Sequence, residues 1–372
     1  MPKADEVIAG KIRLIQEIGS GGQGSVWSGI DYTDEIQLLS NVTDIFHPSA
    51  KTKGGKAYVT RNIIEQVLRK KNPPNDINCV IKFLNRRGPE AKIRFNDEFK
   101  ASVMLNDRSI VKVIDYDTDD KTKPGVGPWI HMEYLPGGNL KNTIKERSEP
   151  FSPSEALVLF RRIVRGVYIA HKNDPVIIHR DLKPENILFR DEQTPVISDF
   201  GLCLILEEDR ETITGASEDV GPRHFMAPEL EGSFKTKATP ASDIYSLGKV
   251  LYYMISAGVI VTREDHESIN YDLRNSHDFS PQVEYIYDHL FKYSIQRKPE
   301  DRFQSCTDLL ESIEKLVILT GEHYYPVKEG RKCIVCGEGV YSRKPWIPNK
   351  KIGHKMICNK CGNIQYFLDP NR

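Results

Sequence analysis

In His179-Arg180-Asp181-Leu182-Lys183-Pro184-Glu185-Asn186, acidic, basic and amide side chains follow one another within one short segment. The segment comes directly after the apolar run Val176-Ile177-Ile178, which indicates a rigid element leading into a polar loop. Asp181 could accept a proton, Lys183 could neutralise a phosphate group, and the carbonyl of Asn186 could hold a cation. These residue types suit phosphoryl transfer, which depends on positioning and charge neutralisation more than on covalent chemistry.

The same eight residues resemble the catalytic loop of protein kinases of the Ser/Thr type. The resemblance implies an α+β, bilobal protein-kinase-like fold, with a small β-rich lobe and a large helical lobe. It also implies ATP and Mg²⁺ (or Mn²⁺) as cofactors. In that fold Asp181 orients and deprotonates the acceptor hydroxyl, while Lys183 steadies the γ-phosphate.

Length and composition are compatible with this assignment. The chain has 372 residues, of which 39% are hydrophobic and 28% charged, so it has room for two or three domains. Lys+Arg and Asp+Glu are both 52, so the net charge indicates no partner. The polar start of the chain predicts no signal peptide. The longest apolar run, Val250 to Val261, is shorter than the roughly 20 residues of a membrane span. We therefore expect a cytoplasmic protein without membrane contact.

A glycine-rich stretch lies near the N-terminus. Gly19, Gly21 and Gly24 with Val26 fit the spacing G-x-G-x-x-G-x-V. Such a hairpin can fold over phosphates, whose oxygens then meet backbone N–H groups, but ordinary glycine-rich turns are also common. A dinucleotide-binding site fits poorly, because Val26-Trp27 continues as a strand and no helix opens there.

Lys82 lies inside the apolar strand Cys79–Phe83, where a buried cation is costly and needs an anionic partner. The family resemblance supplies two partners, the α/β-phosphates of the nucleotide and Glu98 on the predicted helix 94–105.

The stretch 129–138 resembles the strand and hinge that join the two lobes of a kinase. By that resemblance Met132 lines the back of the adenine pocket, and the backbone of Glu133 and Leu135 bonds the base. The resemblance also assigns ATP contacts to Val80 and Leu188.

Asp199-Phe200-Gly201 follows the apolar strand 196–198 and begins 18 residues after Asp181. The resemblance implies that Asp199 bridges a metal ion to the β- and γ-phosphates, with Asn186 on a second metal. The predicted helix 154–172 is expected beneath the catalytic loop.

Three charged residues are expected to be structural. Asp243 matches the residue of the buried central helix that braces the backbone of the catalytic loop, and Arg302 should pair with Glu229.

Residues 202–226 resemble an activation loop and carry three candidate phosphorylation sites, Thr212, Thr214 and Ser217. Arg180 is the type of residue that pairs with a phosphate there. A polar loop without phosphorylation is the alternative. Pro222 stands where the family has a threonine that helps to seat a Ser/Thr acceptor, so it weakens the Ser/Thr assignment that Lys183 favours.

Four of the seven cysteines form two closely spaced pairs near the C-terminus, Cys333/Cys336 and Cys358/Cys361. This spacing predicts a tetrahedral structural Zn²⁺ site that resembles a zinc ribbon, with iron as the alternative metal. Residues 331–372 hold nine Lys/Arg and two Asp/Glu, a net charge of +7. Two partners fit this charge: a protein surface, including the acidic kinase lobes of the same chain, or nucleic acid.

The predicted organisation is an N-terminal extension (1–11), a small lobe (12–135) with an insertion at about 31–78, a large lobe (136–318), a linker (319–330) and the four-cysteine zinc-ribbon-like module (331–372). The predicted function is ATP-dependent protein phosphorylation with autophosphorylation of the activation loop. A pseudokinase scaffold that presents the ribbon and a small-molecule kinase are the alternatives.

Overall fold

The computed structural model describes residues 2–9, 11–20, 24–33, 77–84, 89–118, 127–147, 149–200, 203–206, 224–231, 238–275, 281–320, 329–332, 338–346, 353–360 and 364–368. The chain divides into two compact units. The small unit comprises Met1–Val103 and Val111–Tyr134, and the large unit comprises Met104–Ile110 and Leu135–Arg372. Gly21, Pro222, most of the insertion at about 31–78 and the three candidate phosphorylation sites lie outside the described residues.

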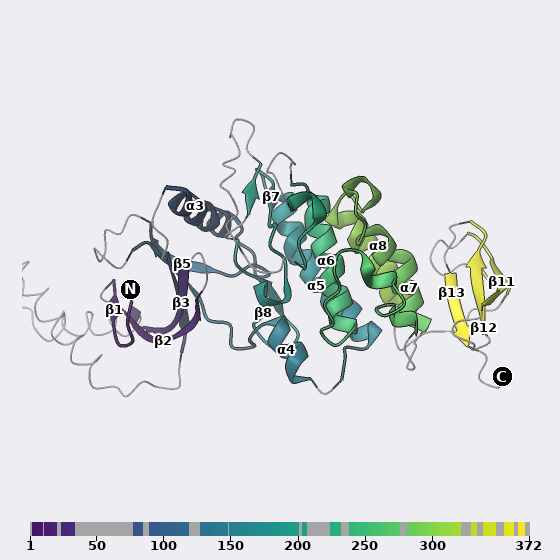
Figure 1. The fold of residues 1–372 in the computed structure, drawn as a ribbon, viewed down its shortest axis with the longest axis horizontal. Helices are drawn as coiled ribbons and strands as arrows, with labels where there is room; N and C mark the ends of the chain where they lie inside the picture. The colour runs from purple at the N-terminus through teal and green to yellow at the C-terminus, as the bar shows by residue number, and fades with distance from the viewer. Residues whose placement is uncertain are drawn as a thin grey trace, which may run out of the picture. The chain divides into compact units, whose positions relative to one another are not determined.

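The small unit contains a six-stranded antiparallel sheet of order β1-β2-β3-β4-β6-β5 (Figure 1). Its strands are β1 (Val7–Ile8), β2 (Ile12–Ser20), β3 (Gly24–Asp31), β4 (Cys79–Leu84), β5 (Val113–Asp117) and β6 (Trp129–Glu133). The hairpin of β2 and β3 and the strand that carries Lys82 are both confirmed.

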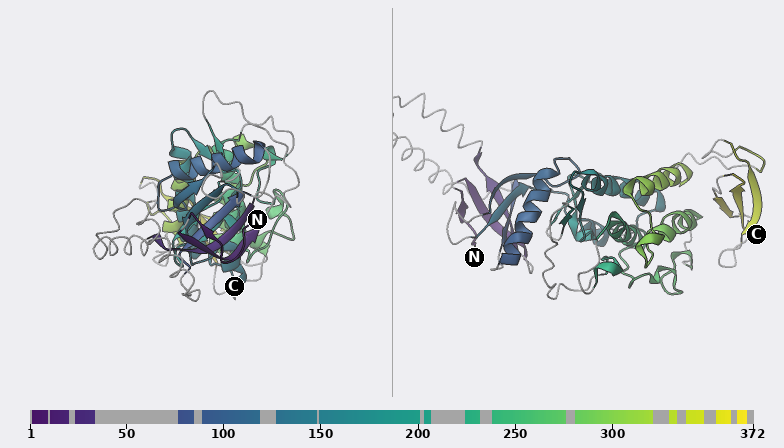
Figure 2. Two further views of the ribbon diagram at one scale, coloured as in Figure 1. Left: turned by 90° about the vertical axis from the view of Figure 1, so that its left-hand side faces the viewer. Right: turned by 90° about the horizontal axis from the view of Figure 1, so that it is seen from above.

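Helix α3 (Pro89–Met104) lies alongside this sheet (Figure 2). It begins at Pro89, five residues before the predicted start at 94. Proline is favoured at the first position of a helix, because the backbone N–H that it lacks would have no partner within the helix there. The rings of Phe99 on α3 and Tyr116 on β5 lie 3.8 Å apart, centroid to centroid, and join the helix to the sheet.

One face of the sheet is an apolar core. It buries Ile8, Ile12, Leu14, Trp27, Cys79, Ile81, Phe83 and Trp129. Side chains alternate between the two faces of a strand, so Lys82, between Ile81 and Phe83, points to the opposite face. Each large apolar side chain buried here contributes about 1.5–3 kcal/mol to folding, and this core therefore fixes the direction of Lys82.

The large unit is mainly helical, with α4 (Leu140–Glu146), α5 (Pro153–Lys172), α6 (Pro240–Ile255), α7 (Pro281–His289) and α8 (Cys306–Thr320). Helix α5 matches the predicted helix 154–172. Its start is stabilised by a capping box, in which Ser152 and Glu155 bond each other's backbone N–H groups. Helix α6 is buried from Ala241 to Ile255, as expected of a central helix.

Two short antiparallel pairs complete the large unit near the catalytic loop: β7 (Ile177–Ile178) with β10 (Leu204–Ile205), and β8 (Ile187–Phe189) with β9 (Pro195–Ile197). Near the C-terminus, β11 (Tyr341–Trp346), β12 (Gly353–Cys358) and β13 (Ile364–Leu368) form a separate three-stranded antiparallel sheet. Tyr341, Met356 and Cys358 are buried in it. Among the described residues, no helix is long and apolar enough to cross a membrane.

Candidate functional site

Lys82 and Glu98 form a buried ion pair in the small unit. Nζ of Lys82 lies 2.5 Å from Oε1 of Glu98, and the two side chains are 11% and 6% exposed. Burial of either charge alone would be costly, so each residue keeps the other ionised and in place. Strand β4 and helix α3 thus hold a lysine ammonium group in a fixed position, as the sequence predicted.

The glycine-rich hairpin adjoins this lysine. Gly19 lies near the end of β2, opposite Val26, and Gly24 begins β3. A Cβ atom on Gly24 would collide with the backbone carbonyl of Phe83, so only glycine fits there. Val26 is also the cross-strand partner of Lys82.

The predicted adenine contacts are distributed over both units. In the small unit, Met132 and Glu133 end β6, and Met132 pairs with Val80 across the sheet. In the large unit, Leu135 is buried and Leu188 lies in β8.

Asp181 is held by two neighbours in its own loop. Nζ of Lys183 lies 2.7 Å from Oδ2 of Asp181, and Nδ2 of Asn186 donates to the same oxygen at 3.1 Å. Asn186 also donates to the backbone carbonyl of Asp181 at 2.8 Å. The carboxylate therefore has a fixed direction, and it is only 19% exposed. This is the geometry that a general base requires.

The ring of His179 bonds the backbone of Asp181. Its Nδ1 accepts a hydrogen bond from the N–H of Asp181 at 3.3 Å, so its Nε2 carries the proton and donates to the carbonyl of Ser198 at 3.0 Å. The ring thus links the catalytic loop to the end of β9.

Asp243 braces the backbone of the loop, which confirms the prediction. It is fully buried, and its carboxylate accepts hydrogen bonds from the N–H groups of His179 at 2.8 Å and Arg180 at 2.9 Å. Arg180 has a φ of 64°, a strained conformation for a non-glycine residue. The two charge-assisted bonds from α6 hold the loop in this conformation.

His171 was missed in the sequence. Its Nε2 lies 2.8 Å from Oδ2 of Asp243, and its Nδ1 lies 3.3 Å from Sγ of Cys306 on α8. Burial opposes protonation of His171, but the bonds to Asp243 and Cys306 outweigh it and raise its pKa to about 10. A histidine in the last turn of the predicted helix was the only signal for this support.

Asn186 and Asp199 lie at the ends of the paired strands β8 and β9, where the N–H of Ser198 donates to the carbonyl of Asn186. Asp199 has a φ of 62°, so the backbone turns sharply at this residue. The amide nitrogen of Asn186 is used in bonds to Asp181, so its Oδ1 is the atom that can face a cation. A carboxylate and an amide oxygen are hard ligands that fit Mg²⁺.

The residues that follow Asp199 are linked back to the loop. Phe200 is buried, with its ring centroid 4.7 Å from that of His179. The guanidinium of Arg180 donates to the carbonyl of Cys203 at 3.2 Å, just before β10. Arg180 therefore lies at the start of the segment that carries the candidate phosphorylation sites.

Glu229 and Arg302 form the predicted ion pair. Two guanidinium nitrogens of Arg302 lie 2.8 Å from the two carboxylate oxygens of Glu229, and the Arg302 side chain is fully buried. Burial alone would raise the pKa of Glu229, but Arg302 outweighs it and keeps this pKa below its usual value.

Of the four predicted zinc ligands, only Cys358 is described. Its Sγ accepts a hydrogen bond from the N–H of Lys360 at 3.4 Å, and a Cβ atom on Gly339 would collide with it. Cys333, Cys336 and Cys361 lie outside the described residues. Within the described part of the chain, no cluster of three or more His, Cys, Asp or Glu side chains could hold a metal ion.

A family model described as "Protein kinase domain" matches residues 64–316. This range includes Lys82 and every residue placed in the catalytic loop. The glycine-rich hairpin precedes it, so the hairpin is supported by its own sequence and geometry alone.

Curated relatives include the serine/threonine-protein kinase PknL of Mycobacterium tuberculosis, 30% identical over 230 residues that cover 60% of this chain and 54% of the relative. PknL of Mycobacterium bovis is 30% identical over 311 residues, which cover 82% and 65%. A probable serine/threonine-protein kinase of Clostridium acetobutylicum is 28% identical over 234 residues, which cover 61% and 34%. The chain thus spans between about a third and two thirds of the length of these relatives.

Proposed function

Because the chain belongs to the protein kinase family, we propose that it transfers the γ-phosphate of ATP to serine and threonine hydroxyls of proteins. The observation that carries this proposal is the fixed carboxylate of Asp181, held by Lys183 and Asn186 on a backbone that Asp243 braces. The names of the relatives, all serine/threonine-protein kinases, support the acceptor class.

The residues divide the work in the following way. Asp181 orients the acceptor hydroxyl and accepts its proton, and the ammonium of Lys183 neutralises charge on the γ-phosphate. Lys82, oriented by Glu98, holds the α/β-phosphates. Mg²⁺ bound by Asn186 and Asp199 would neutralise the phosphate oxygens. A scaffold without catalysis needs none of these pairs, which argues against the pseudokinase alternative.

Incubation of the purified chain with labelled ATP and Mg²⁺ tests this proposal. We expect label in the chain itself or in a generic acceptor such as myelin basic protein, and loss of label when EDTA removes the metal. Mass spectrometry then locates the phosphate, with Thr212, Thr214 and Ser217 as the expected sites of autophosphorylation. ATP binding without transfer to any protein would instead support the pseudokinase or the small-molecule kinase.

Pro222 makes the acceptor type a separate question. The hydroxyl that bonds the catalytic aspartate and lysine in the family is missing, so we propose that Lys183 alone favours Ser/Thr acceptors here. Phosphotyrosine as the main product in the same mass spectra would overturn this part of the proposal.

We also propose that the C-terminal module binds one structural Zn²⁺ through Cys333, Cys336, Cys358 and Cys361. The support is the cysteine spacing, together with the N–H···S bond from Lys360 to Cys358. The use of paired cysteines as ligands suits a reducing compartment, which supports a cytoplasmic location.

Removal of a predicted ligand tests the zinc site. We expect about one Zn²⁺ per wild-type chain by atomic emission, and loss of that metal in Cys358→Ser. A module of about 40 residues has too small a core to fold without a metal site, so the variant should lose the fold of residues 331–372 while kinase activity stays. Cys79→Ser, which changes a cysteine in the small-unit core, is the control that should keep its zinc. Iron in place of zinc would support the alternative metal.

The partner of this module is proposed to be a polyanion or an acidic protein surface, on the basis of its net charge of +7 (nine Lys/Arg, two Asp/Glu in 331–372). Binding of single- and double-stranded oligonucleotides at low salt distinguishes nucleic acid from a protein surface.

A further inference from the structure

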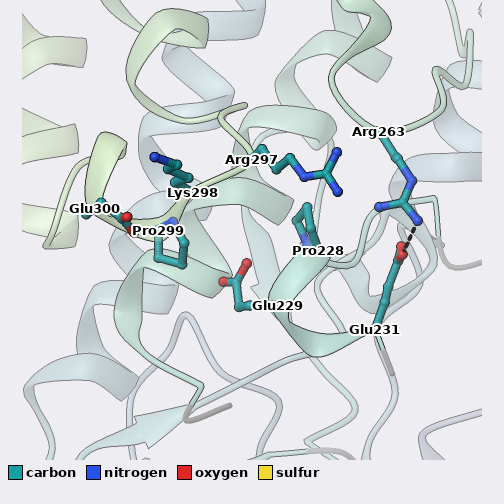
Figure 3. A pocket seen from close by; sticks show the side chains of 8 residues that line it. All are labelled: Pro228, Glu229, Glu231, Arg263, Arg297, Lys298, Pro299 and Glu300. Carbon is teal, nitrogen blue, oxygen red and sulfur yellow. Dashed lines mark ion pairs between the residues drawn. The ribbon is translucent and has the colours of Figure 1, made fainter. Parts of the chain in front are cut away.

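A pocket of about 550 Å³ in the large unit is lined by residues that the proposed reaction does not use (Figure 3). Three segments contribute: the turn η2 (Pro228–Leu230) with Glu231, the loop after α6, and the residues leading into the turn η6 (Pro299–Asp301). The lining residues are Pro228, Glu229, Glu231, Arg263, Arg297, Lys298, Pro299 and Glu300.

Buried Arg302 ties two of these walls together. It bonds the carboxylate of Glu229, which belongs to the first segment, and the carbonyls of Gln296 and Arg297, which lead into η6, at 2.8 and 3.0 Å. The backbone that carries Arg297 is therefore held close to Glu229.

Arg263, in the loop after α6, is also held in place. Its φ is 47°, and its carbonyl accepts a hydrogen bond at 2.6 Å from the buried ammonium of Lys249 on α6. Its guanidinium lies 2.7 Å from a carboxylate oxygen of Glu231. Lys249 thus holds the backbone of Arg263, and Glu231 holds its guanidinium.

The charges at one end of the pocket do not balance. In Figure 3 the guanidinium groups of Arg263 and Arg297 point toward the same space above Pro228. Glu231 pairs with Arg263 there, and Glu229 is already bound by Arg302. Among the described residues, Arg297 has no ion-pair partner, and it is exposed. Because Glu231 is paired with Arg263, the guanidinium of Arg297 is left to bind an anion.

We propose that this end of the pocket binds an anionic side chain, a carboxylate or a phosphoryl group, of the protein substrate. Planar guanidinium forks match both groups through paired hydrogen bonds. The inference rests on the proposed kinase function, which it deepens with a substrate docking site.

The acidic segment of a second copy of the chain has the chemistry that this site requires. Residues 207–219 contain six Asp/Glu and one Arg, and they include the three candidate phosphorylation sites. In autophosphorylation between two copies, one copy presents this stretch as the substrate, and the pocket of the other copy binds one of its acidic or phosphorylated side chains.

Fluorescence anisotropy with a labelled peptide of residues 207–219, unphosphorylated or phosphorylated on Thr214, tests the proposal on the full chain. We expect Arg297→Ala to raise the Kd of the peptide about tenfold, the effect of one charge-assisted hydrogen bond. Arg165→Ala removes another exposed arginine, on α5, and should change the Kd less than twofold. Circular dichroism checks that both variants fold.

The two forms of the peptide distinguish the recognised group. Tighter binding of the phosphorylated form, with displacement by inorganic phosphate, assigns the site to phosphoryl groups, and equal binding assigns it to carboxylates. Equal Kd values for Arg297→Ala and Arg165→Ala, or no binding at low salt, would overturn the proposal. Peptide binding needs no catalysis. A chain without kinase activity in which Arg297→Ala still raises the Kd would therefore refute the kinase function but not the proposed binding site.

Discussion

Asp181→Asn is expected to lower kcat for phosphate transfer by about 10³-fold, within the range of a lost general base. The amide has the shape of the carboxylate but cannot accept the hydroxyl proton. It can still bond Lys183 and Asn186 through its oxygen, since their nitrogens lie 2.7 and 3.1 Å from Oδ2 of Asp181. The loop should therefore keep its conformation while the chemistry stops.

The measurement is the initial rate of label transfer at saturating ATP, together with the KM for ATP. We expect the KM to stay within about twofold, because Asp181 touches the acceptor and not the nucleotide. Asp191→Asn is the matched control: this aspartate is exposed in a nearby turn, where it accepts a hydrogen bond from the N–H of Gln193. A kcat for Asp181→Asn above a tenth of the wild-type value would exclude Asp181 as the base.

Contacts within one motif could be predicted from the sequence, because few residues separate the partners. Asp181, Lys183 and Asn186 lie on one loop, and the fold brings them together. The contacts of Asp243 and the pair of Glu229 with Arg302 span long sequence separations, and only the family resemblance predicted them.

Contacts that depend on how helices pack could not be predicted. His171 and Cys306 are 135 residues apart and meet only because α5 and α8 lie side by side. The strand Val7–Ile8 has two residues, too few for any alternation of apolar and polar side chains to appear. The sequence also could not predict that Arg263 and Arg297 lie near the same pocket, because exposed arginines produce no periodic pattern.

Arg302→Met is expected to lower the free energy of unfolding by about 3–5 kcal/mol, the usual cost of removing one partner from a buried ion pair. Glu229, whose side chain is only 10% exposed, would be left charged without Arg302. The carbonyls of Ala241, Gln296 and Arg297 would also lose their donor. In a unit of this size the melting temperature should fall by roughly 10 °C.

Thermal or urea unfolding of the large unit, followed by circular dichroism, measures this loss. Arg161→Met is the matched control, because Arg161 pairs with Glu314 at 3.0 Å on the surface, with side chains 37% and 53% exposed. Exposed pairs of this kind contribute at most about 1 kcal/mol. A loss of less than about 1 kcal/mol in Arg302→Met would show that the buried pair contributes no more to stability than an exposed one.

The double variant Arg302→Met/Glu229→Gln separates the two causes of the expected loss. With Glu229 neutral, no unpaired charge is buried, so the double variant should be more stable than the sum of the two single losses by about 1.5 kcal/mol or more. The part of the loss that remains is the effect of the three carbonyls left without a donor.

Because Arg302 also fixes the backbone of Arg297, the single variant Arg302→Met should weaken binding of the 207–219 peptide even at temperatures where the chain stays folded. If a folded Arg302→Met variant bound the peptide with wild-type affinity, Arg302 would be needed for the stability of the large unit but not for peptide binding in the pocket.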